Sequence, residues 1–396
     1  MKKNILPILL FLVWPVYGDE IDLVESVPEE TIYGSQMTKR TADVWLEMIN
    51  SAKENIDFEG FYLESAKDRE LEPVIKAVKE KAKSGVKIRF IFEKAMMKTT
   101  AKYLFLLKGP NIQYRVINFK EVAGGVQHSK FFIVDNKEVF VGSQNFDWRS
   151  LSQVHELGAR IKSKDSAFNF RKIFDIDWHL AENPYELEII KNTLLENPIN
   201  DSNKRKAILN GGEVSYYFAF SPKGYIPAGF DSEIDELKKI IDSSQKYIKA
   251  QVMTYSDRHK FNELKDSLEK AALRGVNVKL IFSDWNLGPK KDASIRKLAK
   301  IENIEIKISS IPNNSKGFIA FSRVEHLKYL TGDGDKSFIS TSNWGYDYFY
   351  NTRGAALLID GLSAAKILED IFDRDWNSPY VFAFDPKAKY ENKRKE

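Results

Sequence analysis

The chain has 396 residues, of which 43% are hydrophobic and 29% are charged, so it is a folded globular protein with room for two ordinary domains. The net charge of +4 with neutral histidines excludes a strongly basic, general nucleic-acid binder. The absence of cysteine excludes a disulfide framework, a lipid-attachment cysteine, a cysteine-based zinc site and a cysteine nucleophile.

Residues 1–18 are typical of a secretory signal peptide. Lys2 and Lys3 precede a short apolar run at residues 5–13, and a proline and a Val-Tyr-Gly sequence follow before Asp19. The apolar run is shorter than the ~20 residues that a spanning helix needs. We therefore expect cleavage before Asp19, a mature net charge of +2, and export to a periplasm or the medium. An uncleaved membrane anchor is the alternative.

Next in chain order come alternating helices and strands. Apolar residues at helical spacing predict a helix over 71–83, followed by a strand over 86–92. Short strands at 131–134 and 139–141 flank an Asp-Asn-Lys turn. A polar segment at 197–212, which contains two adjacent glycines, is the expected link between two halves.

The second half repeats these elements. A helix over 234–243 precedes a strand over 247–253, and strands at 330–335 and 338–339 form a second hairpin. Alternation of this kind predicts two tandem α/β sandwich lobes with mixed β-sheets, related by a pseudo-two-fold axis, with the site at the lobe interface. We place the first lobe at residues 19–200 and the second at 201–396.

The pattern His-x-Lys-x4-Asp occurs twice, although the chain has only five histidines. Its members are His128, Lys130 and Asp135 in the first copy and His326, Lys328 and Asp333 in the second. The copies lie 198 residues apart, and an asparagine follows each histidine by 17 residues, at Asn145 and Asn343. A long common offset indicates two copies of one folding unit. In each copy His and Lys should share one face of a strand, and the aspartate should tie a turn together.

These residue types suit cleavage of a phosphodiester. A neutral imidazole is a nucleophile near its usual pKa of about 6.5, and a second, protonated imidazole can release the departing oxygen and later activate water. Two lysines and two asparagine amides can surround the phosphate oxygens with donors. Positive charge from lysines would take the place of a metal. The remaining histidines, His155, His179 and His259, are dispersed and do not predict a metal site.

The doubled motif, with its tail Gly142-Ser143-Gln144-Asn145, resembles the phospholipase D superfamily. One branch, the endolysosomal phospholipase-D-like proteins of animals (the third and fourth family members), is more closely similar. The segments that carry this similarity are residues 24–29, 142–151, 156–158, 341–344 and 375–380. The resemblance implies a metal-independent 5′→3′ exonuclease on single-stranded DNA and RNA, without a cofactor. Lipid transphosphatidylation is also an activity of the family.

The resemblance implies roles for individual residues. The catalytic set is His128, Lys130, His326, Lys328, Asn145, Asn343 and Glu156. The structural positions of the motif are Asp135, Asp333, Ser143 and Thr341. Candidate substrate contacts are the aromatic residues Tyr62, Trp148, Trp344 and Tyr346, together with Phe61. Glu156 can orient a catalytic imidazole, whereas the matching region near residues 351–352 is not acidic, so we predict that His128 is the nucleophile and His326 the acid and base.

Two other functions remain open at this point. A phospholipase D or transphosphatidylase would favour an exposed apolar rim beside the site, whereas an exonuclease would favour a narrow, closed-end cleft. A phosphate-binding protein without activity is the second alternative. The expected partners are a single-stranded nucleic acid or a phospholipid as substrate, with the chain a monomer or homodimer and no obligate protein partner.

Overall fold

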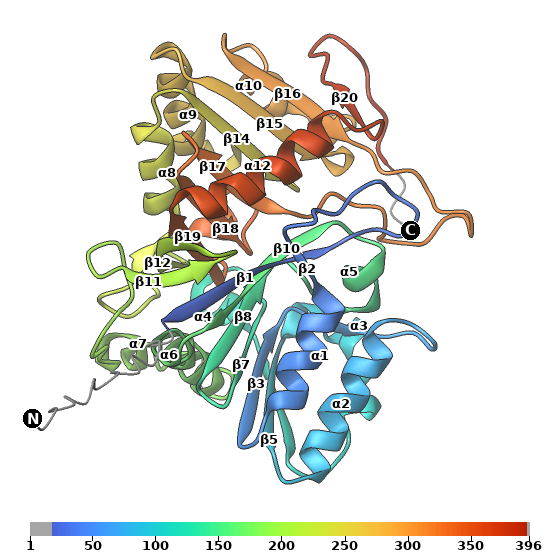
Figure 1. Cartoon of the computed structure of the whole chain (residues 1–396), viewed down its shortest axis with the longest axis vertical. Coiled ribbons are helices and arrows are strands. Elements are labelled where there is room, and N and C mark those ends of the chain that lie inside the picture. The colour runs from blue at the N-terminus through green and yellow to red at the C-terminus, as the bar shows by residue number, and fades with distance from the viewer. Residues whose placement is uncertain (1–17, 394–396) are drawn as a thin grey trace, which may run out of the picture.

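The computed structural model describes residues 18–393 as a mixed α/β fold (Figure 1). The strands up to residue 162 are β1 (Asp19–Ser26), β2 (Lys39–Arg40), β3 (Asn55–Gly60), β4 (Leu63–Glu64), β5 (Lys87–Glu93), β6 (Ile112–Ile117), β7 (Phe131–Val134), β8 (Glu138–Gly142), β9 (Phe146–Asp147) and β10 (Glu156–Lys162). The later strands are β11 (Arg205–Leu209), β12 (Gly212–Ser221), β13 (Asp231–Ser232), β14 (Tyr247–Val252), β15 (Asn277–Ser283), β16 (Ile304–Ser309), β17 (Lys328–Gly332), β18 (Lys336–Ser340), β19 (Gly354–Asp360) and β20 (Val381–Ala383).

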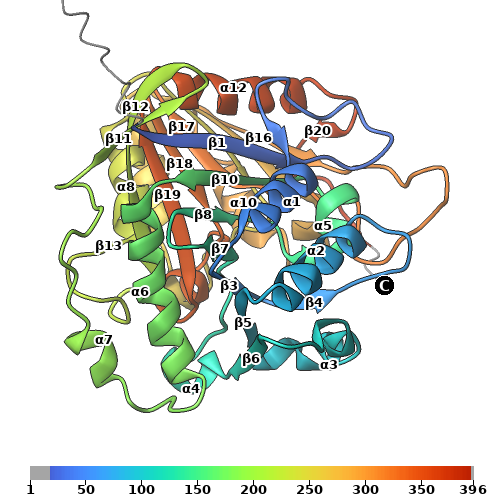
Figure 2. The same cartoon turned by 60° about the horizontal axis from the view of Figure 1, so that its bottom comes forward.

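Helices cover the sheet from both sides (Figure 2). They are α1 (Thr41–Ser51), α2 (Leu71–Lys83), α3 (Met97–Thr100), α4 (Phe119–Ala123), α5 (Trp148–Ser152), α6 (Lys164–Leu180), α7 (Glu188–Asn192), α8 (Glu233–Ser243), α9 (Glu263–Leu273), α10 (Ala293–Leu298), α11 (Tyr346–Tyr350) and α12 (Leu362–Trp376). Short 3-10 turns occur at Lys94–Met96, Leu104–Leu107, Arg258–Lys260 and Asp284–Asn286.

The two halves have the same strand order. In the first half it is β6-β5-β3-β7-β8-β10, and in the second it is β16-β15-β14-β17-β18-β19, with parallel and antiparallel pairs at matching places. Strands β1, β11 and β12 join them, since β1 pairs with β10 and β11, and β12 pairs with β11 and β19. The fold is therefore the expected pair of α/β lobes with mixed sheets, built on one continuous sheet.

The repeated sequence around Gly85 and Gly275 ends a helix in each half. Gly85 follows α2 with φ +100°, and Gly275 follows α9 with φ +89°. Only glycine adopts this left-handed conformation freely, so it stops the helix and turns the chain into the parallel strand that follows. In α2 the buried side chains recur every three or four residues, which packs one face of the helix on the sheet.

The expected polar link over residues 197–212 is partly a strand. Arg205–Leu209 forms β11, in which Ala207 and Leu209 are buried while the residues between them are exposed. This alternation lets the segment pair with β1 and β12. The segment therefore bridges the halves within the sheet.

The motif histidines do not lie on strands, contrary to the expectation. Strand β7 begins at Phe131 and β17 at Lys328, so both histidines occupy the segments that enter the strands. Each lysine instead folds back, with Lys130 Nζ 2.5 Å from the carbonyl oxygen of His128 and Lys328 Nζ 2.6 Å from that of His326. The two-residue spacing therefore lets each lysine side chain bond the backbone carbonyl of its histidine at the start of the strand.

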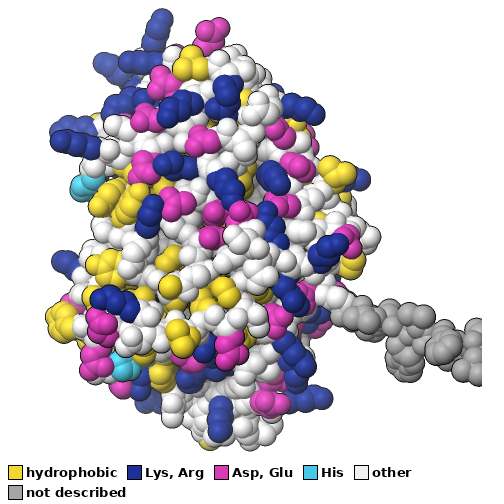
Figure 3. All heavy atoms as spheres, turned by 90° about the vertical axis from the view of Figure 1, so that its left-hand side faces the viewer, with side chains coloured by type: hydrophobic (Ala, Val, Ile, Leu, Met, Phe, Trp, Pro, Cys, Tyr) yellow, Lys and Arg dark blue, Asp and Glu magenta, His cyan; other side chains and the backbone are white. Residues whose placement is uncertain are grey.

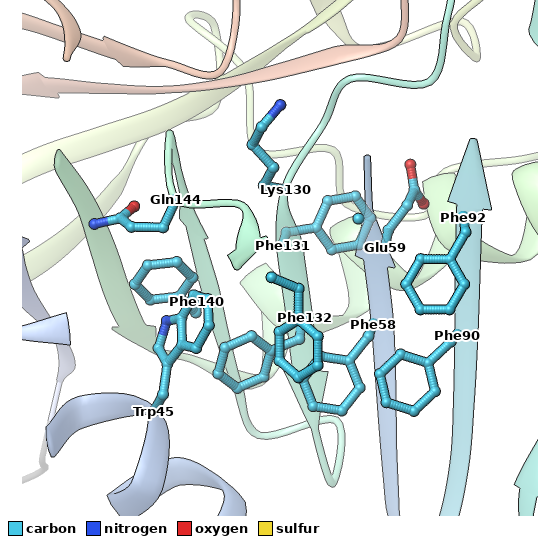
Figure 4. A pocket seen from close by; sticks show the side chains of 12 residues that line it. Trp45, Phe58, Glu59, Phe90, Phe92, Lys130, Phe131, Phe132, Phe140 and Gln144 are labelled. Carbon is cyan, nitrogen blue, oxygen red and sulfur yellow. The ribbon is translucent and has the colours of Figure 1, made fainter. Parts of the chain in front are cut away.

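An aromatic core supports the first motif (Figure 4). Phe58, Phe90, Phe132 and Phe140 project from neighbouring strands, and Lys130, just before β7, points away from these rings. Phe58 and Phe90 stack at 4.5 Å between ring centroids. The lysine ammonium is therefore held at the edge of an apolar layer, facing the other half of the chain.

Among residues 18–393, no helix combines the length and the apolar character that crossing a bilayer requires. The expected signal peptide and its apolar run fall almost entirely within residues 1–17, outside the described part of the chain.

Candidate active site

Both motif histidines line one cleft between the two halves. The cleft has a volume of about 420 Å³, and its walls include His128, His326, Asn145, Asn343 and Glu156. Pockets of several hundred cubic ångströms are the usual size for small-ligand sites. Residues that are 198 positions apart in the sequence therefore meet at a single place.

Each histidine is anchored by a carbonyl group from the opposite half. His128 Nδ1 lies 3.1 Å from the carbonyl oxygen of Thr341, and the backbone of Ser143 provides the equivalent hydrogen bond to His326. Thr341 and Ser143 are themselves 198 residues apart. A carbonyl oxygen can only accept, so it holds the proton on Nδ1 and leaves Nε2 free to react.

The two motif lysines are fully buried, and their ammonium groups are close enough to repel each other. Burial and the charge of Lys328 hold the pKa of Lys130 well below its usual range, and burial lowers the pKa of Lys328 to about 7. Burial and repulsion between the two ammonium groups therefore disfavour their charged forms. Binding of a phosphodiester anion relieves that repulsion, so the site favours an anionic ligand.

The motif aspartates act on the backbone, away from the cleft. Asp135 accepts hydrogen bonds from the N–H groups of residues 53–55 at 2.8–3.0 Å. Asp333 accepts the equivalent bonds from residues 245–247 at 2.7–3.0 Å. Each carboxylate ties the hairpin after the motif strand to the start of the neighbouring strand.

Glu156 contacts His326, the histidine of the other half. Its Oε2 lies 2.6 Å from His326 Nδ1, and both carboxyl oxygens also accept hydrogen bonds, from Ser143 Oγ at 2.5 Å and from Ser150 Oγ at 2.9 Å. Two hydroxyl donors favour the carboxylate as acceptor, so the imidazole donates its Nδ1 proton. Glu156 therefore orients His326.

The partner positions in the second half are different. The residue equivalent to Glu156 at the same offset is Gly354, not residues 351–352 as expected, and the residue equivalent to Ser150 is Tyr348. A Cβ atom at Gly354 would lie 2.3 Å from Ser342 Oγ. A side chain at position 354 has no space, because the carboxylate of Glu233 lies 2.6 Å from that Cβ position and bonds Ser340 and Ser342. Glu156 bonds His326 directly, so the two histidines have unequal environments.

His128 is enclosed by aromatic rings. The ring centroid of Phe61 is 4.9 Å from that of His128, and that of Tyr348 is 5.3 Å away, both edge-on. Burial, together with Lys130 and Lys328, holds the pKa of His128 well below 6.5. This imidazole is therefore neutral near pH 7, which is the form that a nucleophile needs.

The Glu156–His326 pair retains an additional proton. Burial raises the pKa of Glu156 to about 8, whereas burial and the two lysines lower the pKa of His326. The two groups are 2.6 Å apart, so these opposite shifts describe one proton shared between them. When that proton lies on the imidazole, whose Nδ1 faces Glu156, Nε2 of His326 also carries a proton. The pair can therefore protonate a leaving group.

The asparagines of the two tails face the same cleft. Asn145 and Asn343 are buried, and their Oδ1 atoms have no hydrogen-bond partner among the described residues. Asn343 also bonds the hydroxyl of Tyr348. Both amides can turn a donor toward a bound phosphate oxygen.

Activity should follow a bell-shaped pH profile. Protonation of His128 removes the nucleophile at low pH, and loss of the shared proton removes the acid above about pH 8. Steady-state kcat/KM measured from pH 4 to 10 tests this. A rate that stays constant through pH 10 would contradict a protonated His326 pair.

Glu156→Gln should lower the pH of the alkaline limb and leave the acid limb in place, because an amide cannot hold the shared proton. Glu233→Gln is the matched control. Glu233 is also fully buried, and its hydrogen-bond partners among the described residues are the hydroxyls of Ser221, Ser340 and Ser342. If Glu156→Gln moved neither limb, or moved both, the assignment of Glu156 to His326 would be wrong.

Of the five expected aromatic substrate contacts, Phe61 and Tyr62 line the cleft and the other three lie elsewhere. Tyr62 lines the cleft, and its hydroxyl bonds Asp147 at 2.7 Å. Trp148 and Trp344 are buried in the hydrophobic core, at 9% and 2% exposure. Tyr346 stacks on Tyr350 at 4.8 Å, on the surface of α11. Tryptophans that follow the motif tails pack against their own half, which sequence spacing alone does not reveal.

Several residues that line the cleft were not among the candidates predicted from the sequence. Arg149 pairs with Asp147 at 2.9 Å and with Glu64 at the cleft wall. Trp285 and Phe321 come from loops of the second half and line the opposite wall. Phe321 is 42% exposed and has φ +57°, a conformation that is costly for a bulky residue. The loop residues follow no periodic pattern that could have marked them.

One group of described side chains has ligand atoms close enough together for a metal ion. His155, Glu325 and Asp375 place one atom each within 4.8 Å of the others. His155 and Glu325 immediately precede Glu156 and His326 in the sequence, and Asp375 belongs to α12. Both imidazole nitrogens already face carboxylates, since Glu25 Oε1 is 2.8 Å from Nε2, and we assign no metal there.

Comparison with known proteins identifies the family. The family model described as "Cardiolipin synthase, PLD-like domain" matches twice, at residues 45–178 and 237–376, and each match contains one copy of the motif. The chain belongs to the phospholipase D superfamily. It is a phosphodiesterase of that superfamily, as the two intact motif copies in one cleft require.

Relatives of this superfamily member match along most of its length. The 5'-3' exonuclease PLD3 of Xenopus laevis is 31% identical, with 94% of this chain and 82% of the relative covered. Phospholipase D Z of Dictyostelium discoideum is also 31% identical, with 92% and 91% covered. The crystal structure of phosphatidylserine synthase from Haemophilus influenzae has a TM-score of 0.63 at 14% identity, covering 87% and 85%, and so shares the fold.

Proposed function

We propose that this phosphodiesterase is a metal-independent 5′→3′ exonuclease on single-stranded DNA and RNA that works through a phosphohistidine at His128. The observation that carries the proposal is the composition of the cleft. It combines the two histidines with five aromatic side chains, Phe61, Tyr62, Trp285, Phe321 and Tyr348. Aromatic faces stack on any base and contribute roughly 1–3 kcal/mol each, without selecting sequence. Relatives named as 5'-3' exonucleases support this substrate class.

The proposed reaction has two displacements. Nε2 of His128 attacks phosphorus, the bond to the leaving oxygen breaks, and that oxygen takes the proton from Nε2 of His326. Water then attacks the phosphohistidine while His326 removes its proton. The phosphorus–nitrogen bond breaks, and its electron pair returns to His128. Lys130, Lys328 and the two asparagine amides stabilise the charge on the phosphate oxygens in both steps.

The net charge and the face of the molecule in Figure 3 agree with an attraction for phosphate that is local to the cleft. On the face shown in Figure 3, lysine and arginine are interspersed with aspartate and glutamate, and no large patch of positive or negative charge appears. The net charge of the chain is +4. Binding should therefore depend on the cleft itself, and we expect a modest dependence of KM on salt concentration.

A phospholipase D or transphosphatidylase is the second candidate. Phe318 and Phe321 are large apolar side chains on one loop of the second half, exposed at 40% and 42%, and Phe321 lines the cleft. Such side chains can contact acyl chains. A relative named phospholipase D Z also supports this candidate.

The deciding experiment presents both substrates in parallel. Purified protein is incubated with a 5′-labelled single-stranded oligonucleotide and with phosphatidylcholine vesicles, each with EDTA. We expect stepwise release from the 5′ end, no loss of rate in EDTA, and little choline release. His128→Ala prepared in the same way controls for contaminating nucleases. Cleavage that starts at the 3′ end, or faster turnover of the lipid, would refute the exonuclease proposal.

The role of metal is tested in the same assay. Lys130 and Lys328 are both fully buried beside the histidines and supply the positive charge that Mg²⁺ supplies in other phosphodiesterases. We therefore expect equal rates with EDTA and with added Mg²⁺. If EDTA abolished turnover and a divalent ion restored it, the chemistry would not be metal-independent.

We further propose that the chain is exported after removal of residues 1–18 and that the two lobes divide near residue 200. Export is supported by the sequence of the first 18 residues alone. N-terminal sequencing of the protein recovered from outside the cytoplasm tests it, with Asp19 as the expected first residue.

A further inference from the structure

His155 is a fully buried histidine that the proposed reaction does not use. It immediately precedes Glu156, and its backbone joins the segment that enters the second motif. His155 N–H donates to the carbonyl of Val324 at 3.0 Å, and His326 N–H donates to the carbonyl of His155 at 2.9 Å. This short parallel bridge fixes the position of the His326 backbone relative to that of Glu156.

The imidazole of His155 lies among carboxylates from both halves. Nε2 is 2.8 Å from Glu25 Oε1, and Nδ1 is 3.0 Å from Glu325 Oε1 and 3.5 Å from Asp375 Oδ2. Glu25 belongs to β1, Asp375 to α12, and Glu325 to the segment before β17. The Nε2 contact is a hydrogen bond, whereas the Nδ1 contact is an ion-pair contact without hydrogen-bond geometry. A carboxylate only accepts, so favourable contacts at both nitrogens require a proton on each.

The remaining groups around the ring balance its charge. Arg374 pairs with Glu25 at 3.1 Å and with Asp375 at 2.9 Å, and Arg40 lies 3.5 Å from Glu25. The Tyr33 ring stacks on His155 at 4.5 Å, and Tyr329 lies near Asp375. Burial raises the pKa of Asp375 to about 7, and Arg374 and Arg40 face the carboxylates around the ring. A charged His155 further reduces the negative charge that is buried there.

The other half of the molecule places an arginine at the equivalent position. Arg353 lies 198 residues after His155 and makes the same backbone contacts, donating to Val126 and accepting from His128 at 2.9 and 3.0 Å. Its guanidinium binds Asp177, which is the equivalent of Asp375, through two contacts of 2.8 Å. One copy of the unit thus has a permanent cation behind its catalytic histidine. The repeat favours a cation in the other copy as well.

We propose that His155 is a positioning residue: as a buried imidazolium held between Glu25 and Glu325, it fixes the contact between Glu156 and His326. This inference rests on the proposed function for its kinetic consequence, but its charge state can be measured without turnover. Burial opposes the charge, yet Glu325, Asp375 and Glu25 outweigh it and raise the pKa of His155 to about 10.

The test uses the full chain with 13C-labelled histidine. Five histidines give five imidazole signals, which single substitutions assign. We expect the His155 ring to remain charged from pH 5 to 9. A ring that titrates near the usual 6.5, or one that is neutral throughout and changes on addition of EDTA, would overturn the proposal, the latter in favour of a bound metal.

Two variants separate positioning from simple folding. His155→Gln removes the charge and His155→Lys retains it. We expect His155→Gln to lower kcat roughly 100-fold with little change in KM, since misplacement by about 1 Å has effects of this size, and to move the alkaline limb of the pH profile to lower pH. His155→Lys should recover most of kcat. His179→Gln is the control, because His179 pairs with Glu186 at 2.8 Å on the surface.

The kinetic outcomes are decisive in both directions. An unchanged kcat and pH profile in a folded His155→Gln protein would refute the positioning role. So would equal losses in His155→Gln and His155→Lys. If the wild-type protein cleaves no phosphodiester, the proposed function fails, and the 13C signals of His326 in wild type and His155→Gln still report whether its titration depends on His155.

Discussion

His128→Ala is expected to lower kcat by roughly 10⁴-fold or more on every substrate, since loss of a nucleophile removes both displacements. His326→Ala should be equally damaging for an oligonucleotide, whose leaving oxygen needs a proton. With a p-nitrophenyl phosphodiester the leaving group departs without protonation, so His326→Ala should still release one equivalent of p-nitrophenol. The unequal environments of the two rings, aromatic for His128 and carboxylate for His326, are the basis of this difference.

Rapid-mixing absorbance with equal concentrations of each variant checks the prediction. His179→Gln, on the surface, controls for the loss of a histidine as such. A burst from His128→Ala and none from His326→Ala would exchange the two roles.

Arg353→Met is expected to destabilise the protein by about 3–5 kcal/mol, the usual result of leaving one partner of a buried ion pair alone. Arg353 and Asp177 are both fully buried, and the guanidinium also donates to the carbonyls of Ser221 and Tyr225 at 3.1 Å. The substitution leaves an uncompensated carboxylate between the halves.

Urea denaturation followed by circular dichroism measures this effect. Lys191→Met is the control, because Lys191 pairs with Glu188 at 2.7 Å, both side chains are exposed, and such surface pairs contribute about 0–1 kcal/mol. Equal losses from the two substitutions would show that the buried pair does not hold the halves together.

The sequence was informative wherever a feature repeats. The two His-x-Lys-x4-Asp copies, the glycines at 85 and 275 and the alternating elements led to the two α/β units and to the histidines that meet in the cleft. A repeated pattern has to fit the same backbone geometry twice. A chance match is therefore much rarer for a repeated pattern than for a single motif.

The sequence was least informative where the two copies differ or where loops fold over the site. Glu156 is one residue of the first half, yet its partner is His326 in the second, a contact that depends on how the halves pack. Trp148 and Trp344 adjoin motif tails but point into the core, whereas Phe321 reaches the cleft from a loop. The direction of a side chain in such segments is set by tertiary packing, and the spacing of residues in the sequence does not reveal that packing.

The most direct test of the mechanism locates the covalent intermediate. Wild type, His128→Ala and His326→Ala are mixed with a p-nitrophenyl phosphodiester, quenched at alkaline pH to preserve phosphohistidine, digested and examined by mass spectrometry. The account predicts, in His326→Ala, a peptide in which His128 carries the phosphoryl group with its remaining ester substituent, and no such peptide in His128→Ala. Phosphorylation of His326 in the His128→Ala protein, or turnover without any histidine adduct, would contradict it.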